Sequence, residues 1–231
     1  MSAKFFGTGR RVASAGWDHS AVVKVDIWSD VQCPWCYIGK RKFERAVELF
    51  DGDVEVEYHS FELAPDTPVD YAGSTAEYLM NKYGMAAEQV AEMQERVCAI
   101  AASVGLNYHL ESTQQTNTVK AHELLHLANK RGLQEPMKER LLKAYFIEGK
   151  HVGRIPDLVE LASEVGLDPF EVEAALTSNQ YLPDVKADMA QARAYGISGV
   201  PFFVIDGKYG ISGAQETQTF VDALNEASTS S

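Results

Sequence analysis

The feature that most constrains this chain is a pair of cysteines, Cys33 and Cys36, between a strand pattern and a helix pattern. Residues 22–28 are rich in β-branched and aromatic side chains with partial alternation, which predicts a strand. Residues 40–50 carry apolar side chains at the spacing of one helix face. This order predicts Cys33 at the first turn of a helix, with Pro34 where a missing backbone N–H costs least.

A cysteine at the start of a helix is expected to be reactive. Unpaired backbone N–H groups and the positive end of the helix dipole favour a thiolate there. Such surroundings can lower the pKa of a thiol from about 8.5 to roughly 3.5–7.5. Cys36, one turn later, can attack a mixed disulfide formed at Cys33. The pattern therefore predicts a redox pair, and Trp35 between the cysteines is expected to be exposed and to shape the substrate face.

Two other roles for this cysteine pair stay open. A zinc site needs about four ligands, and Cys98 with the scattered histidines does not supply the rest by spacing. A static disulfide is also possible, although three cysteines in 231 residues do not indicate a disulfide-stapled scaffold. His122 and His126 are one helical turn apart, but no third ligand is fixed beside them, so we expect no metal. Cys98 lies in an apolar helical stretch and is expected to be a buried structural cysteine.

Charge and composition exclude some classes of protein. A net charge of −12 argues against a nucleic-acid role, and no run of about 18 apolar residues predicts a membrane helix. Lys40-Arg41-Lys42 is a basic cluster that is either a solvated helix face or an electropositive rim beside the Cys33 thiolate. Residues 1–21 contain Arg10-Arg11 but not the long apolar stretch of an export signal. We expect a flexible N-terminal extension and a cytoplasmic protein.

The rest of the chain predicts an α/β fold with a large all-helical insertion. Residues 54–61 alternate as a second strand and complete a β-α-β unit. Residues 66–182 read as successive helices separated by glycine and proline. A helix, two short strands joined by an Asp206-Gly207 turn, and a last helix then follow. We predict a central mixed sheet flanked by helices from residues 22–65 and 183–227, a helical subdomain at 66–182, and a tail at 228–231.

Three motifs carry a resemblance to a known family. They are Ser-Asp-Val-Gln-Cys-Pro-Trp-Cys-Tyr-Ile-Gly at 29–39, Asn117-Thr118 with Ala121-His122, and Ser-Gly-Val-Pro-Phe-Phe-Val at 198–204. Their order resembles the thioredoxin fold, and the helical insertion resembles its DsbA-like branch, especially the FrnE-type oxidoreductases. These are related to 2-hydroxychromene-2-carboxylate isomerases and kappa-class glutathione transferases. The resemblance covers about residues 22–227.

The resemblance implies roles for residues of all three motifs. Cys33 would be the attacking thiolate and Cys36 the resolving one. The Val200–Pro201 bond would be cis, which is nearly confined to X-Pro, and would bring the Val200 backbone beside the cysteines to pair with an extended substrate. The residues expected to shape the site or bind substrate are Pro34, Trp35, Val200, Pro201, His122 and Asn117, with His122 lining the active-site cleft.

The function that the resemblance implies is that of a cytoplasmic protein disulfide oxidoreductase or isomerase. Its partners would be protein or small-molecule disulfides and thiols, without nucleic acid or membrane, and the chain would be a monomer or homodimer. No metal or nucleotide cofactor is expected, while a low-molecular-weight thiol such as glutathione or mycothiol would be a co-substrate.

Two features of the sequence depart from the relatives. The isomerases and kappa-class transferases typically have serine at the position of Cys33, and this chain lacks the further C-terminal cysteine pair of some FrnE-type proteins. The alternatives are a glutathione-dependent isomerase or transferase, and a chaperone-like binding module.

Overall fold

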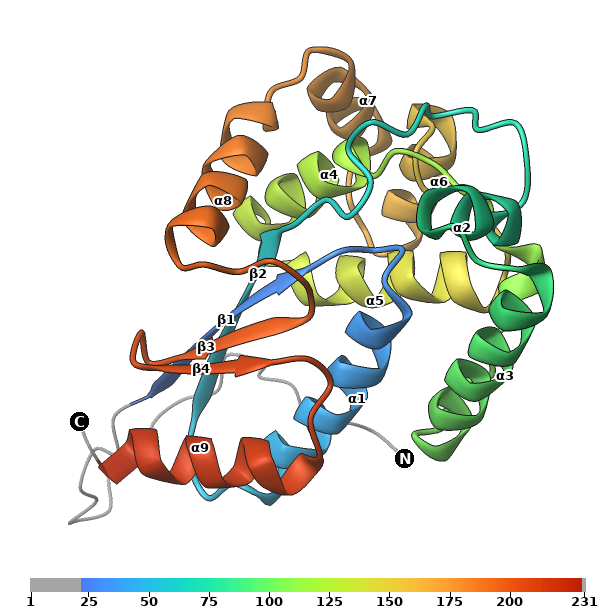
Figure 1. The fold of residues 1–231 in the computed structure, drawn as a ribbon. Coiled ribbons are helices and arrows are strands. Elements are labelled where there is room, and N and C mark those ends of the chain that lie inside the picture. Colours follow the sequence, from blue (N-terminus) through green and yellow to red (C-terminus); the bar gives the residue numbers. More distant parts are fainter. Residues whose placement is uncertain (1–21, 230–231) are drawn as a thin grey trace.

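The computed structural model describes residues 22–229, in which the two outer segments of the chain build one four-stranded mixed sheet (Figure 1). The strand order is β2-β1-β3-β4. β1 pairs in parallel with β2, β3 is antiparallel to β1, and β4 is antiparallel to β3. The strands are β1 (Val23–Ser29), β2 (Val54–Ser60), β3 (Phe202–Ile205) and β4 (Tyr209–Ser212). This is the mixed sheet that the sequence predicts.

Helices occupy the regions in which the sequence predicts them. They are α1 (Pro34–Leu49), α2 (Thr75–Tyr83), α3 (Ala87–Ser103), α4 (Val119–Lys130), α5 (Gln134–Phe146), α6 (Ile155–Glu164), α7 (Pro169–Thr177), α8 (Leu182–Ala194) and α9 (Thr217–Thr229), with a short 3-10 helix at Leu110–Ser112. α9 continues past residue 227, so residues 228 and 229 belong to the helix and not to a tail. The predicted extension at 1–21 lies outside the described residues.

The turn between β3 and β4 could be predicted from its own two central residues, Asp206 and Gly207. Asp206 and Gly207 both have positive φ, 51° and 66°. Positive φ at both central residues of a tight turn matches the right-handed twist of the strands it joins, and Asp-Gly adopts these angles readily. The Lys208 N–H closes this turn by donating to the Ile205 carbonyl over 3.0 Å. Ile205 lies opposite Tyr209 and Phe203 opposite Ile211, so the connection has three residues, 206–208, and is one residue longer than the sequence predicts.

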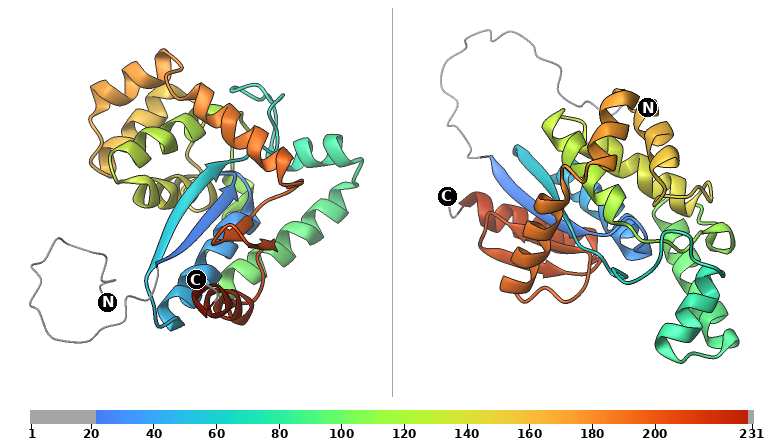
Figure 2. Two further views of the ribbon diagram at one scale, coloured as in Figure 1. Left: turned by 90° about the vertical axis from the view of Figure 1, so that its left-hand side faces the viewer. Right: turned by 90° about the horizontal axis from the view of Figure 1, so that it is seen from above.

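Each face of the sheet is covered by helices. On one face, α1 and α9 meet around Phe43, Phe203 and Phe220, whose ring centroids lie 4.6–5.6 Å apart. On the other face, Trp28 packs with Ala192 of α8 and with other apolar residues of the segment before β3. Figure 2 shows the sheet between α9 and the block of helices that contains α4 to α8.

The helix that carries the cysteines belongs to two cores at once. Its second half contributes Phe43 and Ala46 to the core of the sheet. Its first half contributes Tyr37 and Ile38 to the core that α3 to α7 build among themselves. This double packing fixes the start of α1. None of the helices within residues 22–229 combines the length and the apolar run that crossing a membrane requires.

Candidate active site

The cysteine pair lies where β1 passes into α1. Cys33 has extended backbone angles, φ −89° and ψ 114°, and precedes the first helical residue, Pro34. The backbone N–H of Cys36 donates to the Cys33 carbonyl over 3.0 Å. Both thiols are free and both residues are 3% exposed. The cysteines therefore occupy the strand-to-helix position that the sequence pattern predicts.

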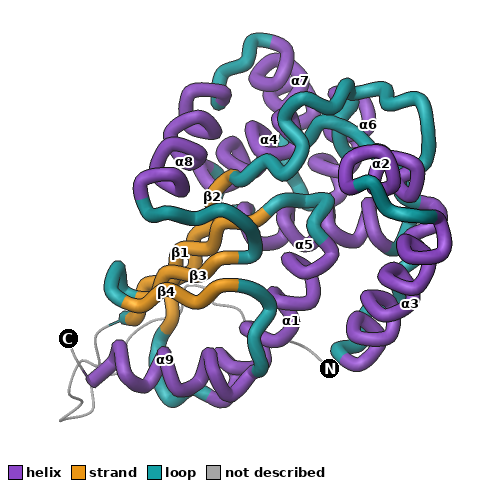
Figure 3. The backbone as a smooth tube through the Cα atoms, viewed as in Figure 1, coloured by secondary structure: helices purple, strands orange, loops and turns teal. Residues whose placement is uncertain are grey.

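A second loop meets the first at this end of the sheet (Figure 3). It joins α8 to β3 and contains the Val200–Pro201 peptide bond, which is cis. The Sγ of Cys33 lies 3.4 Å from the Val200 carbonyl oxygen. The loop can lie close to α1 because residue 39 of this helix is a glycine, where a Cβ would lie 3.0 Å from Cγ of Pro201.

The two thiols act on each other's pKa. Their mutual hydrogen bond, together with burial, raises the pKa of Cys33 well above its ordinary value. Burial acts the same way on Cys36, but the hydrogen bond from Cys33 and the positive charge of Lys138 outweigh it and lower the pKa of Cys36. The helix start predicts the lower pKa at Cys33, whereas the contacts between the two free thiols raise the pKa of Cys33 and lower that of Cys36. The Cys33 thiol faces the Val200 carbonyl, which accepts a proton donor and would repel a thiolate.

A buried carboxylate supports the loop beneath the cysteines. Asp30 is fully buried, and its Oδ2 accepts a hydrogen bond from the N–H of Leu63 over 2.8 Å. Nε2 of His122, on α4, lies 3.4 Å from Oδ1. Burial would raise the pKa of Asp30, but His122 and the Leu63 N–H outweigh burial and lower it. His122 is itself 0% exposed. It therefore backs Asp30 from inside the protein and does not line an open cleft, contrary to the expectation from the motif.

The other predicted site residues divide into exposed and supporting ones. Trp35 is 38% exposed and stands beside the buried sulfurs, as its position suggests. Asn117 supports a loop: its Nδ2 donates to the Pro65 carbonyl over 2.9 Å, and its Oδ1 accepts from the Val119 N–H at the start of α4. Asn117 thus ties the connection between β2 and α2 to the helical block.

Two residues near the cysteines gave no signal in the sequence. Tyr108, between α3 and α4, donates from its hydroxyl to the Pro34 carbonyl over 2.8 Å. Lys138, on α5, is fully buried, and its charge acts on both cysteines. Each is an isolated residue far from the Cys-x-x-Cys motif in the sequence. Only the packing of the helical block against α1 brings them to the site.

The basic cluster after the cysteines has neither of its two expected roles. Lys40 is 3% exposed and ion-pairs with Glu44, Glu135 and Glu139. Its neighbours Arg41 and Lys42 also pair with carboxylates. The cluster ties α1 to its neighbours, so it is neither a solvated face nor a free electropositive rim.

Cys98 differs in part from its expected place. Its residue is partly buried on α3, where it packs against the helical core, and burial raises its pKa. It is thus less enclosed than the sequence suggests. Nothing in the described residues places it with the pair on α1.

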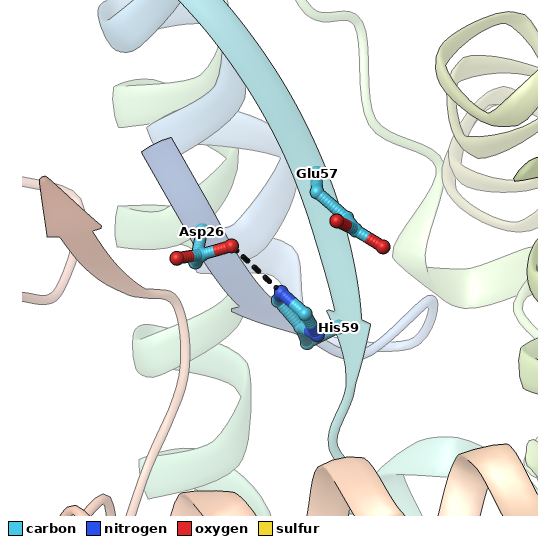
Figure 4. A group of neighbouring side chains, drawn as sticks. All are labelled: Asp26, Glu57 and His59. Atoms are coloured by element: carbon cyan, nitrogen blue, oxygen red, sulfur yellow. Dashed lines mark hydrogen bonds and ion pairs between the residues drawn. The ribbon is translucent and has the colours of Figure 1, made fainter. Parts of the chain in front are cut away.

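A separate polar cluster lies on the sheet face that α8 covers. Ligand-type atoms of Asp26, Glu57 and His59 lie within 4.8 Å of one another (Figure 4). His59 Nε2 is 2.9 Å from Asp26, its Nδ1 is 3.0 Å from Asp188 of α8, and its ring stacks on Trp28. Burial opposes protonation, but the two carboxylates raise the pKa of His59 to about 9. The resulting cation also offsets the repulsion between Asp26 and Glu57, which lie opposite each other on the neighbouring strands β1 and β2.

The predicted pair of histidines on α4 is divided between two carboxylates. His126 Nε2 lies 3.0 Å from Asp188, whereas His122 lies beside Asp30. One helical turn therefore separates two independent histidine–carboxylate contacts, and the spacing does not bring both imidazoles to one ligand.

A mixed sheet, free cysteines at the start of the first helix and a cis-proline loop opposite them define a thioredoxin-fold protein of the dithiol type. The chain matches the model of the DSBA-like thioredoxin domain over residues 24–225, and it belongs to this family. It is 30% identical over 210 residues to the uncharacterized protein YwbO of Bacillus subtilis, covering 88% of this chain and 96% of that protein.

Solved structures give the same result. The crystal structure of a probable DsbA oxidoreductase from Streptomyces coelicolor superposes with a TM-score of 0.84 at 41% identity, over 89% of each chain. A 2-hydroxychromene-2-carboxylate isomerase shares the fold at 15% identity, with a TM-score of 0.68 over 88% of this chain and 95% of that one. The cytosolic disulfide reductase DsbM of Pseudomonas aeruginosa, solved with GSH, shares it at 17% identity, with a TM-score of 0.59 over 89% and 96%. The resemblance recognised in the sequence is confirmed.

Proposed function

We propose that this protein is a thiol–disulfide oxidoreductase that exchanges disulfides through Cys33 and Cys36. The observation that carries the proposal is the pair of free thiols at the start of α1, with one sulfur 3.4 Å from the Val200 carbonyl. Membership of the DSBA-like family and the likeness to a probable DsbA oxidoreductase support the reaction class.

The proposed exchange starts from a site with the proton on Cys33 and a thiolate at Cys36. Cys33 attacks one sulfur of a substrate disulfide while its proton passes to the Cys36 thiolate, and the other substrate sulfur leaves as a thiolate. Cys36 then attacks the Cys33 sulfur of the mixed disulfide, and its proton leaves with the second substrate thiol. The site loses two electrons to the substrate and ends as the Cys33–Cys36 disulfide. The reverse sequence oxidises two substrate thiols.

The surroundings of the sulfurs favour extended thiol or disulfide substrates. The Val200 backbone beside Cys33 offers polar groups to an extended chain, and the exposed Trp35 offers an apolar surface. We propose that the protein is an oxidoreductase of the FrnE type that acts on protein or small-molecule thiols and disulfides. We also propose a cytoplasmic location, with glutathione or mycothiol as the co-substrate. The cytosolic reductase DsbM, solved with GSH, supports this choice by its shared fold.

The test is equilibration of the purified protein with glutathione buffers of known ratio, with the thiols counted by mass spectrometry after alkylation. We expect a reversible two-electron couple in the wild type. A potential near −120 to −180 mV would indicate an oxidant or isomerase, and one near −270 mV a thioredoxin-like reductant. Cys36→Ser should accumulate a mixed disulfide with glutathione at Cys33, because the resolving thiol is gone.

Cys98→Ser is the matched control, since it removes the third thiol of the chain and should leave the couple unchanged. Absence of any reversible couple in the wild type would refute the proposal. Glutathione-dependent turnover that survives Cys33→Ser would favour the isomerase or transferase alternative instead. Suppression of aggregation by the Cys33→Ser, Cys36→Ser double variant would support a chaperone-like role.

A further inference from the structure

The side chain of Lys138 is the least expected one near the site. It lies on α5 and is 1% exposed, and no described residue hydrogen-bonds to its Nζ. The ammonium group stands 5.6 Å from the centre of the Tyr58 ring, which satisfies it only weakly. Lysine is almost never fully buried without a partner, because desolvation of the charge is costly. A feature this unfavourable for stability calls for a reason other than packing.

The charges around Lys138 supply that reason. The groups that interact with it electrostatically are Cys36, Asp30 and Cys33, which favour its charge, and Lys40, which disfavours it. Burial lowers the pKa of Lys138 to about 8 despite those thiols and that carboxylate, so it is mostly charged at neutral pH. Asp30 already has His122 and the Leu63 N–H as partners. Of Asp30 and the cysteine pair, only the cysteine pair changes its charge when a disulfide forms.

We propose, on the basis of the function proposed above, that Lys138 is a positioning residue for the redox chemistry of this site. Its buried ammonium group stabilises the Cys36 thiolate in the dithiol form and so makes the Cys33–Cys36 disulfide easier to reduce. Two substrate thiols lose two electrons and two protons when they reduce this disulfide. The site takes both electrons and one proton, at Cys33, while the second proton goes to solvent and Cys36 keeps the negative charge.

In this role Lys138 stabilises the dithiol form but not the disulfide form. In the dithiol form the ammonium interacts electrostatically with the Cys36 thiolate, and the attraction offsets part of its desolvation cost. In the disulfide form that thiolate no longer exists and the same ammonium is a net cost. Replacing Lys138 by a neutral side chain should therefore stabilise the disulfide form relative to the dithiol form.

The experiment compares Lys138→Met with the wild type in three measurements. These are the pH profile of alkylation of the cysteine pair by iodoacetamide, the equilibrium constant with glutathione, and urea unfolding of both redox forms. We expect the alkylation profile to move to higher pH by about one unit and the equilibrium to favour the disulfide by about tenfold, roughly 30 mV. The disulfide form should be at least as stable as in the wild type.

Lys143→Met is the matched control, because it makes the same substitution on the exposed side of α5. It should change neither the alkylation profile nor the equilibrium. Lys138→Gln, with a polar neutral side chain, repeats the test if the methionine variant does not fold. Equal destabilisation of both redox forms, with the profile and the equilibrium unmoved, would show a purely structural lysine and overturn the inference. A wild type without a redox couple would instead refute the proposed function.

Discussion

The ion pairs of His59 provide a prediction whose size can be worked out from the structure. The pKa of His59 is raised from 6.5 to about 9 by Asp188 and Asp26, despite burial. A group whose pKa is raised on folding stabilises the protein fully below its unfolded pKa, and this contribution is lost as the pH rises through the folded value. The stabilisation by His59 should therefore be complete below about pH 6.5 and gone above about pH 9.

The magnitude follows from the same two values. At about 1.4 kcal/mol for each pKa unit, the difference corresponds to about 3.5 kcal/mol. The side chain of His59 is 13% exposed and that of Asp26 is 37% exposed, so solvent screens part of the interaction. We expect about 2–3 kcal/mol of the free energy of unfolding to depend on the charge of His59.

The assay is urea unfolding of the wild type and His59→Gln, followed by circular dichroism at pH 6 and pH 10. The difference between the two proteins should be about 2–3 kcal/mol larger at pH 6 than at pH 10. Loss of the stacking on Trp28 adds a cost that does not vary with pH. His109→Gln is the control, because His109 is half-exposed and 3.4 Å from Glu111. A difference between wild type and His59→Gln that stays constant from pH 6 to pH 10 would refute the reasoning.

Two further substitutions test how the helical block supports the site. Tyr108→Phe removes the hydrogen bond to the Pro34 carbonyl but keeps the stacked ring, so we expect a loss of about 0.5–1.5 kcal/mol in urea unfolding. The exposed Tyr83→Phe is its control, and an equal loss in both would contradict this role. Gly153→Ala would place a Cβ 2.1 Å from Oγ1 of Thr116, which should cost about 1–3 kcal/mol by overpacking. Gly199→Ala is the control, because its Cβ meets open space and should change the stability by less than about 0.5 kcal/mol. An equal loss of stability in the two variants would contradict the predicted clash with Thr116.

The sequence predicts the parts of this protein that depend on local signals. Alternation and helical spacing locate the strands and helices, and Asp206-Gly207 fixes the hairpin because those two residues accept positive φ. The start of α1 at Pro34 follows from the rigid geometry of proline. Each of these features is decided within a few residues.

The features that the sequence misses depend on contacts between distant segments. The Cys33 thiol meets the Val200 carbonyl, 167 positions away, only because the loop before β3 folds back toward α1. His122 is buried because α4 packs behind Asp30. Lys138 comes close to the pair only through the packing of α5. The helix start beside the cysteines can be inferred from the sequence, whereas the polar and charged groups that other segments bring to the cysteines cannot.

The two cores that α1 joins limit how this fold can be altered. Tyr37 and Ile38 at its start depend on residues of the helical block, and Phe43 and Ala46 further along depend on the sheet. A graft of the Cys-Pro-Trp-Cys segment onto a bare thioredoxin-type sheet would leave the first turns of the helix exposed. It would also leave behind Lys138 and Tyr108. The redox motif and the helical block are therefore expected to be inherited, exchanged or engineered as one unit.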